Sequence, residues 1–337
     1  MSKTAKQIIG IIVLVLLLWG FNLVGKRISL PPTSEPIKIG VIAPLTGVVA
    51  DYGEEVRKGA EAGAVGKKVE VVFEDDKCDP KEAVSAFQKL AGFQKVQYVI
   101  GPACGSPQEA IVPLINGKEI IAIVPSAASS ELFAKSGGNL FNIQYSLEDE
   151  SKFIAEKMGE MGYKNVALVS YGNAFSQSHA NSFRQNFKGK IVVDSQLVDE
   201  ASDVVPEVTK IAAAKIDAVY SPDISFFFSG GLTKLRQQKV LVPIFSTYVV
   251  ELPAAREFVS GVTYSYPVDI DSAQAAVYTL SKQATELLAQ AAIDCNSVYT
   301  CVKDKLNSSG LFNQNGVSNR SLILKQIKDG VPTIINQ

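Results

Sequence analysis

Side chains that could carry catalysis or bind a metal are scarce in this 337-residue sequence. It contains one histidine, His179, which we expect on the surface of a helix. The cysteines form no CxxC pair, and neither GxSxG nor GxGxxG is present. An acidic cluster at 74–79 lacks the spacing of a calcium loop and is typical of a solvated turn. We therefore predict no enzyme activity, metal or cofactor.

Residues that could bind a small molecule instead follow predicted strands. Ser106, Pro107 and Glu109 come after an apolar run and have the spacing of a capping box. We expect a helix to begin at Ser106. Its free backbone N–H groups and its dipole would favour an anion such as a carboxylate. A plain helix cap is the alternative interpretation.

Two further loops of the first half have suitable residues. Ser126, Ala127 and Ala128 are small, so a ligand could approach their backbone closely. Tyr52 stands where the first loop meets a helix. It could cover a ligand, or it could pack against its own lobe.

In the second half, Phe175, Asp223 and Tyr248 each follow an apolar run. Aromatic side chains at strand ends suit a mostly apolar ligand. Each aromatic residue taken alone is more typical of core packing.

The elements that would position these loops alternate along the chain. Amphipathic stretches at 81–93 and 148–161 and a long helix near 271–293 separate or follow short apolar runs. Continuous apolar strands between helices indicate parallel sheets covered on both faces, so the predicted fold class is α/β. In such sheets ligands bind beyond the carboxyl ends of the strands. The predicted strands are 37–43, 69–73, 98–101, 120–125, 166–170, 191–193, 218–220 and 244–247.

The N-terminus has the pattern of an export signal. Lys3 and Lys6 precede an apolar run at 8–24, and Lys26 and Arg27 follow it. The run is about long enough to span a bilayer and lacks a good cleavage site. We expect an uncleaved anchor and a proline-rich linker over residues 1–36, with a cleaved signal as the alternative. The folded part would then be extracytoplasmic and tethered to the cytoplasmic membrane.

Composition and cysteine usage agree with export. The formal net charge of −1 argues against a nucleic-acid partner. An even number of cysteines in an oxidising compartment suggests disulfides. The four are Cys78, Cys104, Cys295 and Cys301.

Four segments of the first half resemble periplasmic binding proteins for branched-chain amino acids. IKIGVIAPLTG at 37–47, with DYG at 51–53, is similar to the opening of that family. EDDKCDPKEA at 74–83, YVIGPACGS at 98–106 and PSAASSEL at 125–132 are similar to the motifs of its next three strands. Order and spacing agree, and the likeness runs from residue 37 towards the C-terminus, strongest in the first half.

The resemblance implies two Rossmann-like lobes joined by three crossovers and closing about a hinge. The N-terminal lobe would comprise residues 37–144 plus about 268–312. The C-terminal lobe would comprise residues 145–267 plus about 313–337. It also implies a Cys78–Cys104 disulfide, and we expect Cys295 and Cys301 to close a smaller loop.

By position, the resemblance assigns carboxylate contacts to Gly105, Ser106 and the loop 126–128, with Tyr52 nearby. Several positions depart from the family pattern, so the ligand can differ from the family's usual one. Ala128 replaces a common threonine, Phe175 and Ile224 stand where tyrosines occur, and Tyr248 replaces the acidic partner of the ligand's ammonium. Asp223 is the nearest substitute for that acid. We expect an apolar or aromatic molecule with an anionic or amide head.

The sequence thus predicts a monomeric binding protein that delivers a small molecule to an ABC transporter permease. The alternative is a ligand-sensing receptor subunit that acts through a separate membrane partner. A permease and an ATPase encoded nearby would favour the first.

Overall fold

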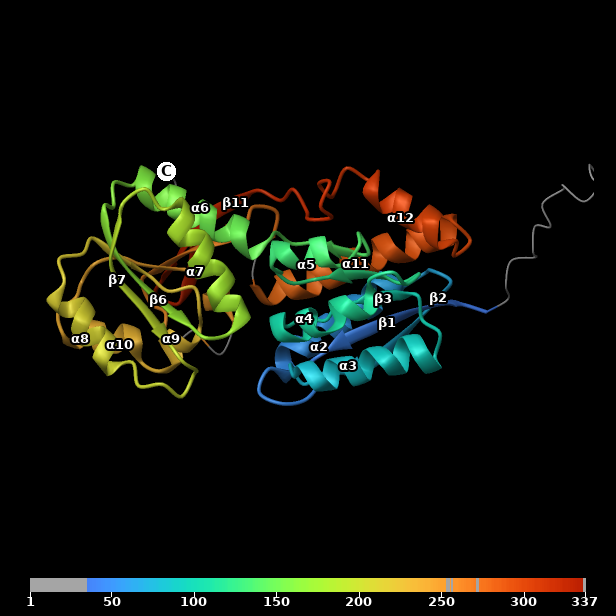
Figure 1. The fold of residues 1–337 in the computed structure, drawn as a ribbon, viewed down its shortest axis with the longest axis horizontal. Helices are drawn as coiled ribbons and strands as arrows, with labels where there is room; N and C mark the ends of the chain where they lie inside the picture. Colours follow the sequence, from blue (N-terminus) through green and yellow to red (C-terminus); the bar gives the residue numbers. More distant parts are fainter. Residues whose placement is uncertain (1–34, 253–254, 256, 271–272, 336–337) are drawn as a thin grey trace, which may run out of the picture. The chain divides into compact units, whose positions relative to one another are not determined.

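A computed structural model of the protein describes residues 35–252, 255, 257–270 and 273–335. Two sheets form its framework (Figure 1). The predicted anchor at 8–24 lies outside the described residues. Among the helices that the structure does describe, none is long and apolar enough to cross a membrane.

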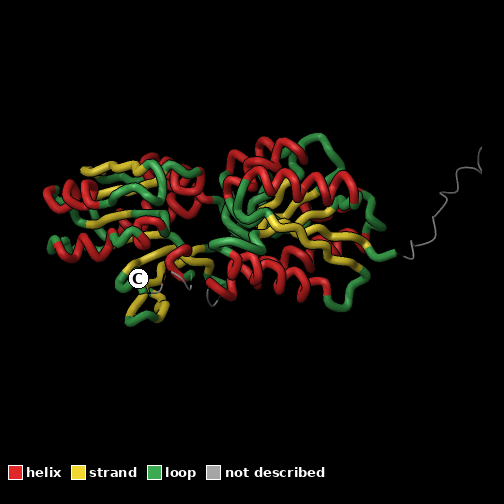
Figure 2. Tube along the Cα trace, turned by 90° about the horizontal axis from the view of Figure 1, so that it is seen from below, coloured by secondary structure: helices red, strands yellow, loops and turns green. Residues whose placement is uncertain are grey.

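The first sheet is entirely parallel, as predicted. Its order is β2-β1-β3-β4-β5, and helices lie on both of its faces (Figure 2). Its strands are β1 (Ile37–Ala43), β2 (Val69–Asp75), β3 (Tyr98–Ile100), β4 (Ile121–Val124) and β5 (Leu140–Asn142). The helical segments between them are α2 (Ala50–Ala64), α3 (Pro80–Gln88), η1 (Lys89–Phe93), α4 (Gly105–Ile115) and α5 (Ser130–Lys135).

The second sheet is mixed, which corrects the expectation of parallel strands throughout. Its order is β12-β11-β10-β9-β8-β6-β7, and β11 and β12 run antiparallel at one edge. Its strands are β6 (Asn165–Tyr171), β7 (Lys190–Leu197), β8 (Ala218–Tyr220), β9 (Ile244–Ser246), β10 (Val262–Pro267), β11 (Leu322–Lys328) and β12 (Val331–Ile334). Parallel strands need long crossovers, whereas a tight turn at Asp329 and Gly330 suffices for β11 and β12.

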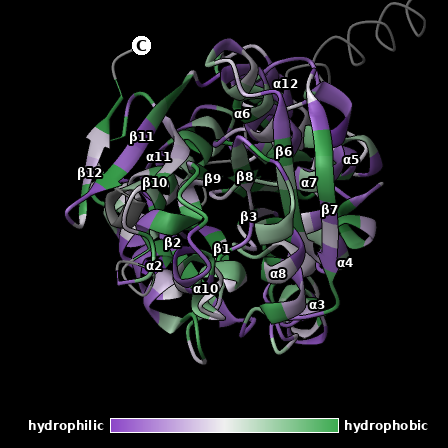
Figure 3. Cartoon of the chain, turned by 90° about the vertical axis from the view of Figure 1, so that its left-hand side faces the viewer, coloured by the Kyte–Doolittle hydropathy of each residue, from purple (hydrophilic) through white to green (hydrophobic). Residues whose placement is uncertain are grey.

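Helices of the second half are mostly short. They are α6 (Leu147–Glu160), α7 (Ala174–Asn186), α8 (Val205–Ala213), α9 (Ser225–Phe228), α10 (Gly231–Gln237) and the 3₁₀ turn η2 (Tyr248–Glu251). Strand β7 lies at the open edge, and its residues alternate in burial. Accordingly it carries both hydrophobic and hydrophilic residues (Figure 3).

The chain returns to the first half through α11 (Ala273–Asp294), which packs on α2, and α12 (Tyr299–Asn307). Two glycines of α2 allow the close approach. A Cβ atom at Gly59 would lie 2.3 Å from the Tyr278 carbonyl oxygen, and one at Gly63 2.5 Å from that of Lys282. Larger residues there would push the helices apart. The chain then enters the second sheet again at β11.

Both expected disulfides are present. Cys78 pairs with Cys104 and Cys295 with Cys301, each with a Cα–Cα distance of 5.6 Å. The first ties the loop after β2 to the residue preceding α4. The second ties the end of α11 to α12. The bridges thus fix the loop before α4 and the C-terminal end of α11.

Candidate ligand-binding site

The start of α4 presents two backbone donors at the carboxyl end of the first sheet. The helix begins at Gly105 with Cys104 as its N-cap, and no side chain caps it. The prediction that Ser106 caps the helix is therefore wrong: Ser106 lies one residue inside the first turn. Cys104 has the extended backbone of an N-cap residue. Its carbonyl accepts the first hydrogen bond of the helix, from the Gln108 N–H, at 3.0 Å.

The earlier start of the helix leaves two backbone N–H groups in its first turn without an acceptor. Pro107 has no N–H, and no described residue accepts a hydrogen bond from the N–H of Gly105 or of Ser106. Helix N-termini of this kind stabilise negative charge. The two residues to which the resemblance assigned carboxylate contacts therefore carry the free donors of this helix.

A buried polar pair supports the neighbouring loop after β4. The Gln108 amide donates to the Ser126 hydroxyl at 2.9 Å and to the Pro102 carbonyl at 3.1 Å. Both side chains are almost fully buried. The Gln108 side-chain oxygen has no hydrogen-bond partner among the described residues. Sequence reasoning missed Gln108, although a polar residue in the first turn of a buried helix was a usable signal.

The rest of this loop is held by its neighbours. Ala127 and Ala128 are buried, and the Ala128 carbonyl accepts a hydrogen bond from the Leu147 N–H at 3.1 Å. A threonine side chain at position 128 would have to fit this packed environment.

Tyr52 joins the two halves of the predicted site. It is partly buried, and its hydroxyl is close enough to the side chains of Ser126 and Tyr248 for both to affect its pKa. Burial raises its pKa above the usual range, against the smaller opposite effects of those two neighbours. A neutral phenol therefore stands between the first-half loop and the second-half aromatic residue.

Phe175 and Asp223 lie at the end of the second sheet. Phe175 is partly buried in the first turn of α7, which Asn173 caps. The Asn173 amide donates to Asp223 Oδ2 at 2.8 Å, and Ser225 donates to Asp223 Oδ1 from both its N–H and its hydroxyl. Both carboxylate oxygens of Asp223 thus already accept hydrogen bonds within this half. Fewer of their lone pairs are left to accept hydrogen bonds from a ligand's ammonium group.

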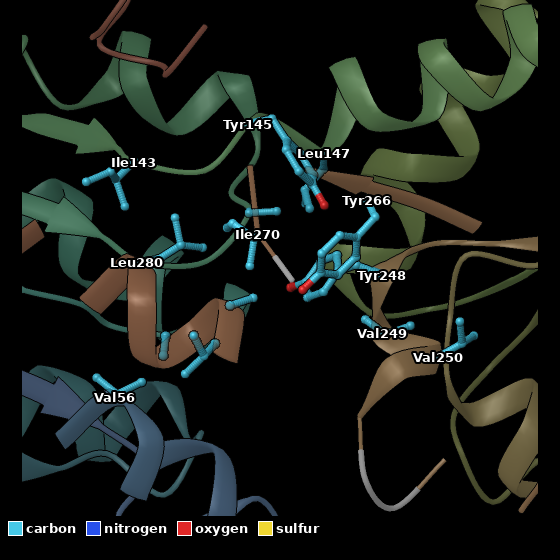
Figure 4. Close-up of a cluster of buried hydrophobic side chains, with 14 of the residues drawn as sticks. Val56, Ile143, Tyr145, Leu147, Tyr248, Val249, Val250, Tyr266, Ile270 and Leu280 are labelled. Carbon is cyan, nitrogen blue, oxygen red and sulfur yellow. The ribbon is translucent and has the colours of Figure 1, made fainter. Parts of the chain in front are cut away.

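Tyr248 begins η2 and is nearly buried. Its ring meets that of Tyr145 edge-on, with centroids 6.4 Å apart. Figure 4 shows Tyr145 and Leu147 pointing toward Tyr248 and Tyr266. Burial raises the pKa of Tyr248 well above its usual value, so the phenol stays neutral.

The principal residue that sequence reasoning missed is Glu150, in the first turn of α6. It is fully buried, and its Oε1 accepts from the Tyr145 hydroxyl at 3.3 Å, the Tyr248 N–H at 3.2 Å and the Ser265 hydroxyl. Burial raises its pKa to about 8. The available signal was spacing: Glu150 lies on the same helix face as Ile154 and Met158, which form the core.

His179 is also buried, which corrects the expectation of a surface residue. Its Nδ1 lies 2.7 Å from the Ser151 hydroxyl, and its ring meets Phe175 edge-on at 4.6 Å. Burial lowers its pKa to about 3. Within the acidic cluster at 74–79, Asp76 is likewise buried rather than solvated, and burial raises its pKa to about 6. Over the described residues, no group of three His, Cys, Asp or Glu could hold a metal ion.

Comparison with curated proteins finds relatives that are binding proteins. The chain is 28% identical over 263 residues to Leu/Ile/Val-binding protein homolog 3 of Brucella melitensis, covering 74% of this chain and 68% of that protein. It is 28% identical over 213 residues to Leu/Ile/Val-binding protein BraC3 of Rhizobium johnstonii, covering 59% and 58%. Most of these matches span little more than half of the relatives' length, for example 54% of the Escherichia coli K12 Leu/Ile/Val-binding protein.

Solved structures share the fold. A leucine binding protein from Thermotoga maritima has a TM-score of 0.79 at 17% identity, covering 89% of this chain and 98% of that one. A Rhodopseudomonas palustris solute binding protein in complex with 3,4-dihydroxybenzoic acid has a TM-score of 0.75 at 18% identity, covering 89% and 96%. At these identities the likeness establishes the fold alone.

The sequence profile of the periplasmic binding protein family matches residues 36–276, which is more than half of the chain. The order of motifs in the first half and the fold of both sheets agree with that match. The chain therefore belongs to the periplasmic binding protein family, to the type I proteins that include the Leu/Ile/Val-binding proteins.

Proposed function

We propose that the protein is an extracytoplasmic solute-binding protein that captures a small carboxylate or amide molecule and delivers it to an ABC transporter permease. The observation that supports this most directly is the position of Tyr52, whose hydroxyl is close enough to Ser126 of the first half and Tyr248 of the second half for both to affect its pKa. The curated relatives are named as binding proteins, and a solved structure with the same fold is a solute-binding protein of an ABC transporter, in keeping with a role other than catalysis.

The lobes of the proposal follow the sheets. The N-terminal lobe comprises residues 37–144 plus about 268–312, and the C-terminal lobe residues 145–267 plus about 313–337. The packing of α11 on α2 and the place of β11 beside β10 support this division. Ligand between the lobes would shift the population toward a closed state, so small-angle scattering should show a smaller radius at saturation. Residues 1–36 would tether the protein to the membrane, as their apolar run indicates.

The proposed ligand has an apolar or aromatic body and an anionic or amide head. The N–H groups of Gly105 and Ser106 would bind the head, and Ser126, Ala127 and Ala128 would line its surroundings. Tyr52, Phe175 and Tyr248 would face the body. A buried ammonium group needs an anion, and Asp223 is already engaged with Asn173 and Ser225.

Calorimetry tests the ligand class directly. Benzoate and the 2-keto acids of leucine, isoleucine and valine should bind with micromolar affinity, about −8 kcal/mol, and the three amino acids more weakly. Asp223→Asn should leave benzoate binding unchanged. Submicromolar leucine binding that survives this substitution would restore the specificity of the named relatives and contradict the proposal.

A further inference from the structure

A network of buried polar side chains lies behind Phe175 and Tyr248, which together form the aromatic wall of the second half. It links Glu150 and Ser151 of α6, His179 of α7 and Tyr220 of β8, all with no exposed surface. The Ser151 hydroxyl lies 2.7 Å from both His179 Nδ1 and the Tyr220 hydroxyl. Of these elements, α7 carries Phe175, and α6 contacts Tyr248 through Glu150.

The two oxygens of Glu150 have different surroundings. Oε1 accepts three hydrogen bonds, from Tyr145, Tyr248 and Ser265. Oε2 is buried and accepts none from the described residues, and the same holds for His179 Nε2. These two atoms lie 3.6 Å apart. Each is therefore a polar neighbour that is available to the other.

The groups around the pair supply no compensating charge. Besides His179, the titratable groups facing Glu150 are the phenols of Tyr145, Tyr220 and Tyr248. The remaining polar neighbours are the Ser151 and Ser265 hydroxyls. The hydrogen-bond partners of the Glu150 and His179 side chains are thus neutral groups. An isolated charge in such a dry environment is costly, so a neutral pair is the stable arrangement.

We propose that Glu150 and His179 form an uncharged pair, in which Glu150 keeps its proton and its Oε2 faces the unprotonated Nε2 of His179, and that this pair positions Phe175 and Tyr248, the aromatic wall of the ligand site. Glu150 acts through the backbone of Tyr248, and His179 acts through the ring of Phe175. The inference rests on the proposed function and deepens it. An uncharged wall accepts a ligand carboxylate and offers an ammonium group no anion.

The arrangement specifies a tautomer. Nδ1 of His179 carries a proton and donates to Ser151, and the unprotonated Nε2 faces the protonated carboxyl of Glu150. Burial raises the pKa of Glu150 to about 8 and lowers that of His179 to about 3, which agrees with both groups being uncharged near neutral pH. Ionisation of Glu150 at higher pH would place a negative charge behind Tyr248 and repel a bound carboxylate.

Because His179 is the only histidine, nuclear magnetic resonance of protein carrying ¹⁵N-labelled histidine gives a single imidazole. We expect Nδ1 protonated and Nε2 unprotonated from pH 5 to 7.5, with a change at Nε2 near pH 8. Glu150→Gln should abolish that change, and Glu156→Gln, an exposed glutamate of the same helix, should keep it. An imidazole that titrates near its ordinary pKa, or a proton resident on Nε2, would overturn the proposal.

Calorimetry with benzoate tests the positioning role without requiring the natural ligand. Affinity of the wild type should fall about tenfold from pH 6.5 to 9, the effect of one poorly screened charge nearby. Glu150→Gln should bind equally at both values, and circular dichroism would verify that it is folded. Equal wild-type affinity at both values would refute the role. If benzoate does not bind at all, the proposed ligand class fails. The imidazole spectrum still decides whether His179 and Glu150 form the uncharged pair.

Discussion

The two sides of the candidate site are built from different chemistry. On the first half, backbone N–H groups of Gly105 and Ser106 and neutral polar side chains of Ser126 and Gln108 provide the polar contacts. On the second half, the rings of Phe175 and Tyr248 are supported by the buried Glu150 and His179. The first side depends on local backbone geometry, and the second on groups brought together from distant segments.

This difference explains what each side can tolerate. A backbone donor pair survives most side-chain changes, provided the loop before α4 keeps its shape. A buried ionisable group is sensitive to the loss of any one partner, because an unpaired polar atom in the interior costs about 1–3 kcal/mol. Substitutions should therefore act on the first side through the loop and on the second side through side-chain contacts.

The largest expected effect concerns the disulfide that fixes the loop before α4. Replacing Cys78 and Cys104 together by serine removes a crosslink across 26 residues. In the chain-entropy model this lowers the free energy of unfolding by about 3–4 kcal/mol. The matched Cys295→Ser and Cys301→Ser protein should lose only about 2 kcal/mol, because its loop spans 6 residues. Urea unfolding of both proteins measures the difference, and equal losses would contradict this account.

The second prediction concerns the pH dependence of stability. From pH 4.5 to 6.5 the folded chain holds its proton on Glu150 and the unfolded chain holds one on His179, so the contribution of these two groups to stability is level. Above pH 6.5 the folded state retains a proton that the unfolded state loses. Stability should then fall as pH rises to about 8, by about 2 kcal/mol.

The same proton count predicts how stability changes below pH 4.5. Below pH 4.5 the unfolded chain protonates both groups while His179 stays neutral in the fold, down to about pH 3. Stability should again fall by about 2 kcal/mol. Thermal unfolding across this range measures both slopes. In Glu150→Gln the loss above pH 6.5 should disappear, and the acid-side loss should begin near pH 6.5 instead of pH 4.5, because only the unfolded chain then gains a proton, on His179. A variant that keeps the alkaline loss would show that another group causes it.

The smallest expected effect concerns the contact between the two sides. Tyr52→Phe and Tyr248→Phe each remove a hydroxyl while keeping the ring. Each should weaken benzoate binding by about 1 kcal/mol, or roughly fivefold. The double variant should lose less than the sum, since both substitutions remove the same interaction. Fully additive losses in calorimetry would indicate that the two hydroxyls act independently.

Much of the fold was predictable because strand and helix patterns are local. β1 was predicted with its observed bounds, and the predicted strands at 166–170 and 218–220 match β6 and β8 within a residue or so. The antiparallel pair β11 and β12 was missed. Their place beside β10 depends on sequence separated by the whole of α11 and α12, and local periodicity carries no information on such pairing.

By itself the sequence determined the α/β class and the family, because short motifs encode turns and strand ends directly, and it predicted the first-half loops of the candidate site. Only the tertiary structure decided that Cys104 rather than Ser106 precedes α4, that His179 is buried, and that Glu150 lies against Tyr248. The physical reason is burial. Whether a polar side chain meets water or another segment depends on contacts across more than ninety residues, and those contacts also set its charge.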